Sequence, residues 1–366
     1  MVGSKVVRYL IPMVLVIIAG CGGGEDDTTM VTGLSQGRWG HTAMLLEDGR
    51  VLVVGGQGTP TLKFNTAEIF DPNADSWSSA DSMVEKRGTG HTATMLADGR
   101  VLVTGETDDG SAEIYDPSTG QWSAAGVMLE PRVLHTTTLL ADGRVLVAGG
   151  GSPPRAVREY NSAEIYDPST GQWSPTGDMQ NKHSADSAIL LQDGRVLVVG
   201  EYLAEVYDPS AGTWSPAGKP LRERTRGYPL TMLEDGRILI TGGEIQQGGW
   251  TGLTVPVANV DIYDPSDGSW SAASPMEKGH KLHTATRLPD GRVLVVGSRQ
   301  MDLYDPATDT WFIAGELIQM RGEFYTATQL NDGRILVVGG KGDTEEGDRG
   351  LTFVETYDPS TFVPKD

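Results

Sequence analysis

The chain has 366 residues, including 48 glycines and one cysteine, and its 49 acidic and 29 basic side chains give a formal net charge of −20 at pH 7. A surface of that charge repels the phosphates of nucleic acid, which excludes nucleic acid as a partner. Because Cys21 is the single cysteine, an intrachain disulfide and a zinc site built on cysteines are also excluded.

The first 21 residues have the layout of an export signal. Lys5 and Arg8 precede an apolar run at residues 9–18 that is short for a transmembrane helix. The Ile-Ala-Gly-Cys tetrapeptide ending at Cys21 resembles the lipobox of bacterial lipoproteins. The resemblance implies cleavage before Cys21 and acyl chains, palmitate among them, on this residue. The alternatives are an ordinary cleaved signal with a chance cysteine, or a signal anchor.

The lipobox resemblance sets expectations for the N-terminal domain boundaries and for location. Residues 1–20 would be the signal peptide, and residues 21–28 the acylated cysteine and a flexible tether rich in glycine and acidic residues. Membrane lipid is then a partner through Cys21. We expect a lipid-anchored protein of the cell envelope that faces the periplasm or the cell surface. By analogy with other lipoproteins, Gly22 after the cysteine favours the outer membrane over the inner one.

The remainder of the chain repeats one unit seven times. An Asp-Gly-Arg tripeptide begins at Asp48, Asp98, Asp142, Asp193, Asp235, Asp290 and Asp332. Each copy separates an apolar or small-residue run from a β-branched run, and Asp-Gly between two such runs is a strong hairpin signal because glycine accepts the positive φ of a type I′ turn. One or two glycines follow the second run in every unit, where they let the chain leave the sheet sharply.

A third run in each unit ends in Asp-Pro, at Pro72, Pro117, Pro168, Pro209, Pro265, Pro306 and Pro359. Proline ends a strand because it cannot donate to the ladder of hydrogen bonds. Six units then continue to a tryptophan, at Trp77, Trp122, Trp173, Trp214, Trp270 and Trp311. We expect each tryptophan to begin a short fourth strand and to fill the space between neighbouring units.

Four short antiparallel strands in each of seven units predict an all-β fold, a closed seven-bladed β-propeller. A second strand ending in Gly-Gly, a third ending in Tyr-Asp-Pro and a fourth with Trp together resemble the kelch repeat family. The departures are single glycines in units two, four and six and the missing tryptophan of unit seven. The propeller is expected at residues 29–366, with blades at about 38–80, 87–126, 132–178, 183–219, 225–275, 280–316 and 321–363.

Closure of the ring needs an outer strand for the seventh blade. We expect residues 28–34 to supply it, because they stand where a fourth strand would precede unit one. The alternative is that they belong to the tether. As a closed ring, the protein is expected to be a monomer.

The length of the units varies almost entirely between the second and third strands. Units one, three, five and seven have long connections at residues 57–66, 151–162, 244–259 and 341–353. In an up-and-down blade these connections lie on the face opposite the Asp-Gly-Arg and Asp-Pro turns. One face is therefore expected to be uniform, and the other to carry variable loops of the kind that hold binding residues.

Histidine, tyrosine or aspartate begins the innermost strand of each unit and is expected at the mouth of the central channel. The candidate binding residues there are His41, His91, His135, Asp186, Tyr228, His283 and Tyr325, with Arg38, Arg87, Arg132, Arg226 and Arg321 just upstream. Imidazoles and guanidiniums around a concave mouth are suited to a carboxylate or a sugar acid. Alternatively, they belong to the fold and bond loop carbonyls and acidic side chains.

Further candidates lie in the long loops. Arg155, Arg158, Tyr160 and Trp250 are of the residue types that dominate interface energies. No metal and no cofactor are expected, because no convincing set of ligands occurs in the sequence. Some kelch-like propellers are copper radical oxidases that depend on a cysteine cross-linked to tyrosine, and Cys21 is instead assigned to the anchor.

These patterns favour a binding module over an enzyme. The leading hypothesis is a membrane-anchored propeller that binds a protein or a glycan through the face with the long loops. The first alternative is a periplasmic enzyme, an epimerase or lyase acting on a sugar acid at the channel mouth, as the resemblance to some kelch-like propellers allows. The second is a structural envelope protein.

Overall fold

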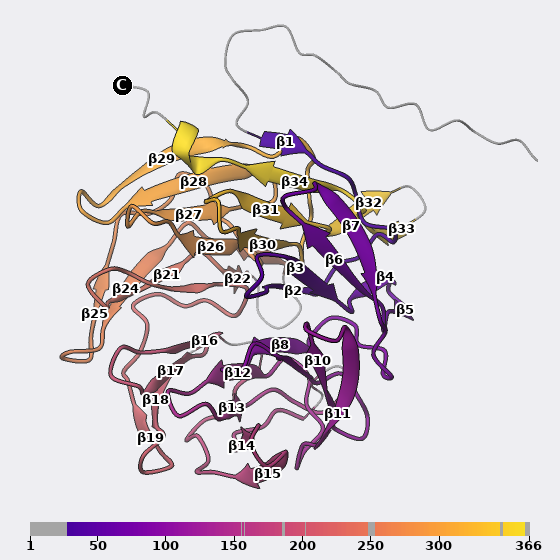
Figure 1. Cartoon of the computed structure of the whole chain (residues 1–366). Coiled ribbons are helices and arrows are strands. Elements are labelled where there is room, and N and C mark those ends of the chain that lie inside the picture. Colours follow the sequence, from indigo (N-terminus) through magenta and orange to yellow (C-terminus); the bar gives the residue numbers. More distant parts are fainter. Residues whose placement is uncertain are drawn as a thin grey trace, which may run out of the picture.

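The computed structural model describes residues 28–154, 156, 158–184, 187–201, 203–247, 253–344 and 347–362. These residues form seven four-stranded antiparallel sheets that surround a common axis, so the predicted seven-bladed β-propeller is confirmed (Figure 1). The predicted signal peptide, Cys21 and most of the tether lie outside the described residues. In the described part of the chain, no helix has the length and apolarity needed to cross a membrane.

The innermost strands contact one another in a closed cycle around the axis. They are β2 (Thr42–Leu45), β8 (Thr92–Met95), β12 (Thr136–Leu139), β16 (Ser187–Leu190), β20 (Leu230–Met232), β26 (Thr284–Arg287) and β30 (Thr326–Gln329). The second strands are β3 (Val51–Val54), β9 (Val101–Thr104), β13 (Val145–Ala148), β17 (Val196–Val199), β21 (Ile238–Thr241), β27 (Val293–Val296) and β31 (Ile335–Val338). Every residue of the second strands is buried, as expected for β-branched strands covered on both faces.

The third strands are β6 (Ala67–Asp71), β10 (Ser111–Asp116), β14 (Ala163–Asp167), β18 (Ala204–Asp208), β24 (Val260–Asp264), β28 (Gln300–Asp305) and β34 (Val354–Tyr357). Six outer strands begin next to the tryptophans: β7 (Ser76–Ala80), β11 (Gln121–Val127), β15 (Gln172–Pro175), β19 (Thr213–Pro216), β25 (Ser269–Ala272) and β29 (Thr310–Glu316). A short 3₁₀ helix, η1 (Pro359–Thr361), follows the seventh third strand.

The N-terminal strand β1 (Thr28–Met30) is the outer strand of the seventh blade. It pairs antiparallel with β34, with Thr28 opposite Tyr357 and Met30 opposite Glu355. This is the pairing expected for residues 28–34. Since β1 replaces the strand that the seventh unit lacks, the ring is closed by hydrogen bonds between the two ends of the chain.

The core consists of seven apolar layers, each between two neighbouring blades. In the layer between blades four and five, Leu197 and Val199 pack against Ile238 and Ile240, and all four are at most 1% exposed. Burial of one such side chain contributes about 1.5–3 kcal/mol. The blades are therefore stabilised by their neighbours, and the closed ring leaves no blade with an uncovered face.

The tryptophans connect neighbouring blades as the sequence predicts. Each indole N–H donates to a backbone carbonyl at the exit of the preceding blade at 2.6–2.8 Å, as Trp173 does to Ala125. Each indole also packs on a tyrosine or phenylalanine of its own third strand, with ring centroids 4.8–5.1 Å apart. In the seventh blade Phe362 packs instead on Phe312, at 6.1 Å.

The face that carries the Asp-Gly-Arg and Asp-Pro turns is here named the turn face. In each Asp-Gly-Arg turn the glycine has a φ of 81–91°, and the arginine folds back so that its Nε donates to the aspartate Oδ2 at 2.7–2.9 Å. Twelve further carboxylates lie in these turns: Glu47, Glu234, Asp71, Asp75, Asp116, Asp167, Asp208, Asp264, Asp267, Asp305, Asp309 and Asp358. The described residues of these turns include no further basic side chain, so the turn face is strongly acidic.

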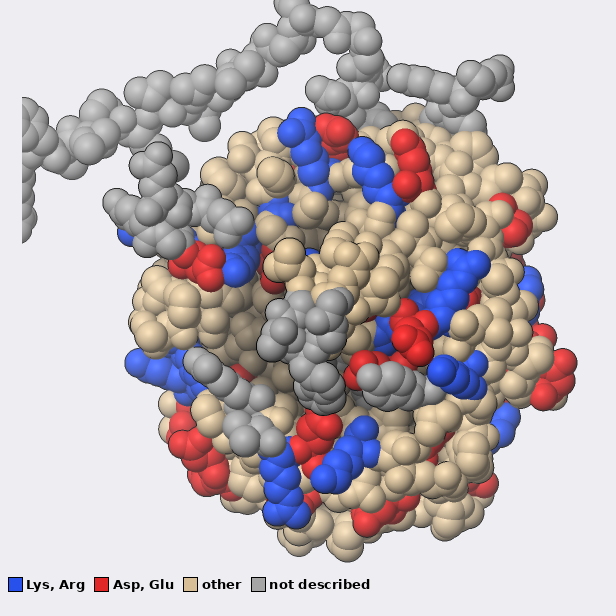
Figure 2. All heavy atoms as spheres, turned by 180° about the vertical axis from the view of Figure 1, so that it is seen from behind, with Lys and Arg blue, Asp and Glu red and all other residues tan. Residues whose placement is uncertain are grey.

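The opposite face, here named the loop face, carries the connections between second and third strands and those between blades. Three long connections form hairpins: β4 (Gln57–Thr59) with β5 (Leu62–Lys63), β22 (Glu244–Gln246) with β23 (Thr254–Pro256), and β32 (Lys341–Thr344) with β33 (Gly347–Gly350). Figure 2 shows the molecule from behind the view of Figure 1, with basic and acidic side chains next to one another around the disc and wide uncharged areas between them.

Candidate functional site

A hollow of about 600 Å³ opens at the centre of the loop face, where the innermost strands begin. We name it the central hollow. Of the predicted mouth residues, His41, His91, His135, Arg226, Tyr228, His283 and Tyr325 line it together. The sequence therefore located the residues that surround the axis, although Asp186 lies outside the described residues.

Three imidazoles of the central hollow are held by threonine hydroxyls. The Nε2 atoms of His41, His135 and His283 lie 3.0, 2.8 and 2.9 Å from the Oγ1 atoms of Thr326, Thr104 and Thr241. The Nδ1 atoms of the same rings are buried and have no hydrogen-bond partner among the described residues. This arrangement fits uncharged imidazoles that carry their proton on Nε2.

Burial keeps these histidines neutral. It lowers the pKa of His135 to about 3 and that of His283 to about 3, with a smaller contribution from nearby positive groups such as Arg132 beside His135. Burial also lowers the pKa of His91 to about 4, and it shifts the pKa of His41 in the same direction. The central hollow therefore offers no positive imidazole at neutral pH.

The glycine that ends each second strand makes room for the ring of the next blade. A Cβ on Gly105, whose φ is 90°, would lie 2.5 Å from Cε1 of His135. Where tyrosine replaces histidine, the phenol reaches a backbone carbonyl: Tyr228 donates to Val199 at 2.9 Å and Tyr325 to Val296 at 2.6 Å. The six described rings are thus fixed by the neighbouring blade, which favours the expectation that they belong to the fold.

The arginines are withdrawn from the central hollow into the blades. Arg38, Arg87, Arg132 and Arg321 are at most 1% exposed, and none of them lines the hollow. Arg321 is typical: its Nη1 donates to the carbonyls of Gly339 and Phe353, and its Nη2 lies 2.7 Å from Oε1 of Glu355. These contacts match the structural alternative, in which the guanidiniums bond carbonyls and acidic side chains.

In the fifth blade Arg226 lies at the mouth as predicted, and a second arginine, which the sequence did not single out, takes the buried position. Arg224, and not Arg226, is the buried arginine of that blade, with its Nη2 2.8 Å from Oδ2 of Asp261. Arg226 is 55% exposed in its side chain and pairs with Glu244 at 2.6 Å. The two arginines are two residues apart in an irregular connection, so spacing alone did not distinguish them.

Blades four and six have histidine at the position of the buried arginine. Nε2 of His183 lies 3.0 Å from Oε1 of Glu205, and Nε2 of His280 lies 2.6 Å from Oδ2 of Asp302. Burial alone would raise the pKa of Glu205, but hydrogen bonds from His183 and two backbone N–H groups outweigh it and lower that pKa. Both histidines also bond the long loop of the preceding blade, through bridges to Tyr160 and Val257.

The sequence signal for these pairs is an acidic residue at the same place in every third strand. These residues are Glu68, Glu113, Glu164, Glu205, Asp261, Asp302 and Glu355, and all are at most 5% exposed. A carboxylate at an inward position of an otherwise apolar strand needs a buried partner. All seven have one: an arginine in five blades and a histidine in blades four and six.

The charged groups at the rim of the central hollow compensate one another. Lys281 bridges Oε2 of Glu244 at 3.2 Å and Oε1 of Glu323 at 2.8 Å, while Arg226 holds the other oxygen of Glu244. Of the loop candidates, Arg155 and Trp250 lie outside the described residues. Tyr160 is 9% exposed and packs under Arg132 and Arg158, with Cζ atoms 5.3 and 5.7 Å from its ring. The tyrosine is therefore buried in its loop, whereas Arg158 is exposed.

A backbone feature at the central hollow was not predicted. The residue before each described ring has a positive φ: Gly40 at 63°, Gly90 at 113°, Leu134 at 57°, Gly227 at 72°, Leu282 at 49° and Phe324 at 61°. Glycine is ordinary in this conformation, but leucine and phenylalanine are strained there. Sequence patterns carry no signal for it, because an apolar residue before a strand is unremarkable.

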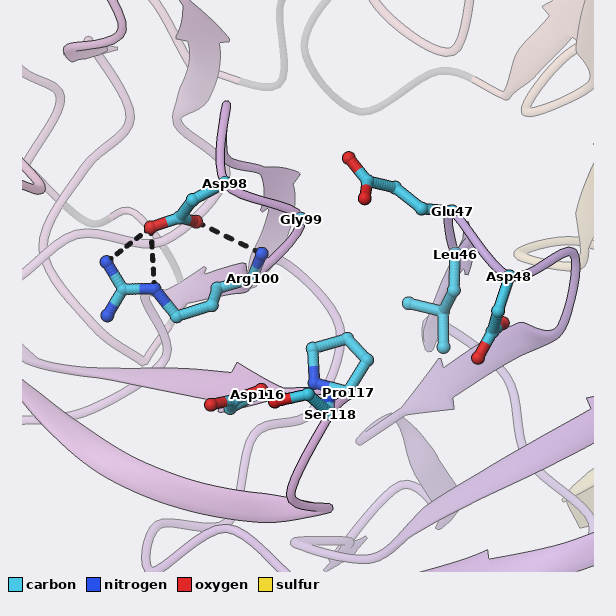
Figure 3. Close-up of a pocket in the computed structure, with 9 residues that line it drawn as sticks. All are labelled: Leu46, Glu47, Asp48, Asp98, Gly99, Arg100, Asp116, Pro117 and Ser118. Atoms are coloured by element: carbon cyan, nitrogen blue, oxygen red, sulfur yellow. Dashed lines mark hydrogen bonds and ion pairs between the residues drawn. The ribbon is translucent and has the colours of Figure 1, made fainter.

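A second hollow, of about 360 Å³, lies on the turn face between blades one and two (Figure 3). Glu47, Asp48, Asp98 and Asp116 contribute carboxylates to it. Asp48 and Asp98 are bound by the arginines of their own turns, and the dashed lines in Figure 3 mark the contacts of Asp98 with Arg100. In the described parts of the chain, no group of three or more histidine, cysteine or acidic side chains is arranged to hold a metal ion. The hollow is a gap between repeated turns.

Comparison with known proteins agrees with the repeat pattern. Residues 48–84 and 134–180, which span most of units one and three, match the Kelch motif. The chain is a seven-bladed propeller with Kelch motifs. The match and the seven blades together support the kelch resemblance.

Among solved structures, the Kelch-motif propeller is similar to a fungal alcohol oxidase of the AA5 family in complex with copper. The TM-score is 0.76 over 92% of this chain and 78% of the oxidase, with 20% sequence identity. At that identity the likeness shows the fold alone. No curated protein matches this chain in sequence.

Proposed function

We propose that this propeller is a non-catalytic binding module whose loop face binds a protein partner. The observation that carries the proposal is the distribution of exposed apolar side chains. Eleven large hydrophobic residues are exposed in the described part of the chain, and eight lie on the loop face: Leu62, Val84, Leu129, Leu203, Leu221, Leu253, Ile318 and Met320. The other three, Met30, Val127 and Ile313, lie on outer strands, and the acidic turn face has none.

Apolar side chains gathered on one face mark an interaction surface, because their exposure to water is unfavourable. Val84 and Leu253 are 81% and 83% exposed, so they are largely uncovered in the free chain. Aliphatic groups offer no hydrogen bonds to the hydroxyls of a sugar, whose burial without partners is costly. A protein surface is therefore a better match for this face than a glycan.

The state of the rings in the central hollow supports binding over catalysis. A general acid or base works best with a pKa near the working pH, and the pKa values of His91, His135 and His283 are lowered to about 3–4. The epimerase or lyase alternative also requires a free cation for the sugar acid. The arginines of the hollow are buried in blades or paired at the rim.

We further propose that the chain is held at the membrane by acyl chains on Cys21, as the lipobox resemblance implies, and faces the periplasm or the cell surface. The position of Thr28 is compatible with this. It begins β1, an outer strand at the perimeter of the disc (Figure 1), so an anchor attached through the preceding residues leaves both faces accessible.

Photo-cross-linking from defined positions tests the loop face. Benzoylphenylalanine would replace Val84 or Ile318 on that face, and Ala97 or Thr308 as exposed controls on the turn face. We expect one protein adduct, seen from the loop-face positions alone. With that protein purified, Val84→Asp and Ile318→Asp should each weaken binding by about tenfold or more, a change of 1.4 kcal/mol.

Adducts of equal yield from both faces, or no adduct from either loop-face position, would overturn the proposal. Glycan binding that the two aspartate variants abolish would replace the protein partner by a glycan. The anchor is tested separately by palmitate labelling and membrane fractionation of Cys21→Ser, with a Cys21→Ser/Ser35→Cys variant to show whether the position of the thiol matters. Membrane association that persists in both variants would contradict acylation at Cys21.

A further inference from the structure

Three strained apolar residues surround the central hollow. Leu134, Leu282 and Phe324 have φ values of 57°, 49° and 61°, where the chain uses glycine in three other blades. Glycine would remove the strain at no steric cost. The strained residues are therefore not explained by the needs of the backbone, and strain of this kind gathers at functional sites.

The glycines and the strained residues occur in neighbouring blades and fit each other. The N–H of Leu134 donates to the carbonyl of Gly90 at 2.9 Å, and that of Leu282 donates to Gly227 at 2.8 Å. A Cβ on Gly90 would lie 3.2 Å from Cδ2 of Leu134, and one on Gly227 would lie 3.1 Å from Cδ2 of Leu282. Each glycine thus leaves the space that its neighbour's leucine occupies beside the hollow.

Phe324 has the same relation to the first blade through its backbone. Its carbonyl accepts a hydrogen bond from the N–H of Gly40 at 2.9 Å. All three side chains are half-buried, and they line the same hollow together with Val133 and Pro229. Apolar side chains from several blades therefore form part of the lining of the hollow.

Among the described residues, the polar groups around the hollow offer no free charge to a charged ligand. The imidazoles are neutral, and the phenols of Tyr228 and Tyr325 are engaged with carbonyls. At the rim, Arg226 and Lys281 are both paired with Glu244. A carboxylate entering the hollow would lose its hydration without gaining a free counter-charge, which is costly.

We propose that the central hollow receives an uncharged apolar side chain at the tip of a loop of the protein partner, and that Leu134, Leu282 and Phe324 are its specificity-determining contacts. The inference rests on the proposed function, since it names what the loop-face partner inserts. Two features select this occupant: the apolar side chains of Leu134, Leu282 and Phe324 line the hollow, and the charged side chains described at its rim are paired with one another. Its volume of about 600 Å³ falls within the range of ligand pockets.

The test uses the leucine-to-glycine substitution that the other blades already contain. Leu134→Gly, Leu282→Gly and the double variant are expected to unfold at a temperature no lower than the parent chain, because glycine relieves the strain at a positive φ. Binding of the purified partner should fall about tenfold or more for each variant. Ile313→Gly, on an outer strand and away from both the hollow and the loop face, is the control for stability.

Small probes separate the chemistry of the hollow from the partner. N-acetyl-leucinamide and N-acetyl-phenylalaninamide are expected to shift the NMR signals of residues in the hollow, and the shifts should be lost in the double glycine variant. N-acetyl-aspartate amide and galacturonate are the charged controls and should produce none. Binding of either acid in preference to the leucine probe would overturn the inference and favour a sugar-acid site.

A lower unfolding temperature in both glycine variants, without loss of partner affinity, would show that the leucines support the fold alone and would also overturn the inference. The proposed function fails independently. If the aspartate variants of Val84 and Ile318 keep full partner affinity, the loop face is not the interface. If they lose it while the glycine variants do not, the face is correct and the assignment of the hollow is wrong.

Discussion

Replacing Arg321 by methionine tests the cation–carboxylate pairs inside the blades. The guanidinium and Glu355 are both fully buried, and Nη1 is bonded to two carbonyls at 2.6 and 2.8 Å. Methionine fills most of the volume but leaves the carboxylate charged and the carbonyls of Gly339 and Phe353 without this donor. Removing one partner of a buried pair costs about 3–5 kcal/mol, so we expect the free energy of unfolding to fall by about 4 kcal/mol.

The matched control is the same substitution at an exposed pair. Nε of Arg299 lies 2.8 Å from Oε2 of Glu316, a distance typical of the buried pairs, but the two side chains are 58% and 55% exposed. Arg299→Met should cost less than about 1 kcal/mol because water screens the pair. Urea unfolding followed by tryptophan fluorescence measures both variants. Equal losses would refute the argument that burial, rather than bond geometry, sets the contribution.

A double variant separates charge from packing. Arg321→Met with Glu355→Met removes the uncompensated charge and should recover most of the stability lost in the single variant. If the double variant is less stable than the single one, the carboxylate is held mainly by the backbone N–H groups of Ile318 and Gln319, which donate to it at 2.7 and 3.2 Å. The buried pair would then contribute less than the argument requires.

Three further predictions follow from other contacts. The folded protein holds the pKa of His135 at about 3, whereas an unfolded imidazole gains a proton below about pH 6.5, so lowering the pH from 7 to 5 should reduce the free energy of unfolding by about 2 kcal/mol through this residue. In the double variant His135→Tyr/Thr104→Val, the unfolding midpoint should fall less steeply as the pH is lowered. An unchanged pH profile would contradict a neutral buried ring. Deleting residues 28–34 should open the ring and leave a sheet edge that self-associates. Calorimetry should show a lower melting temperature, and light scattering should show the self-association. A monomer of unchanged melting temperature would contradict closure by β1. Trp173→Leu should cost about 2 kcal/mol in urea unfolding through the lost bond to Ala125 and the lost aromatic contact, and a loss below about 0.5 kcal/mol would show that the indole is not an inter-blade tie.

The fold could be predicted because its signals are local and repeated. An Asp-Gly turn such as Asp142-Gly143 determines a hairpin within a few residues, and seven copies make the ring the simplest arrangement. The strand that closes the ring could also be predicted from the sequence. The seventh unit lacks its tryptophan, and a segment of suitable length precedes the first unit.

The chemistry of the candidate site was harder to predict, because it depends on direction and burial rather than on spacing. The sequence placed His135 and Arg132 together at the mouth, and they are indeed three residues apart on one connection. The structure turns the imidazole toward the central hollow and the guanidinium into the blade, where Glu164 lies 2.8 Å from Nε. The deciding partner is 32 residues away, on the third strand.

The exposed aliphatic residues illustrate the same limit. Val84 follows the buried Met83, and the two are similar in sequence terms. Met83 enters the layer between blades one and two, whereas the next residue points to solvent while its backbone N–H donates to Glu113 at 2.7 Å. Only the three-dimensional arrangement shows that such residues gather on one face.

The pairing of β1 with β34 also bears on how the protein is made. Among the described strands, β1 pairs with β34 alone, so it stays unpaired while six blades are synthesised and folded. Its row of free N–H and C=O groups is then a hazard for pairing with another chain. A chain halted before residue 354 has no strand to receive β1, and its ring stays open however complete the first six blades are.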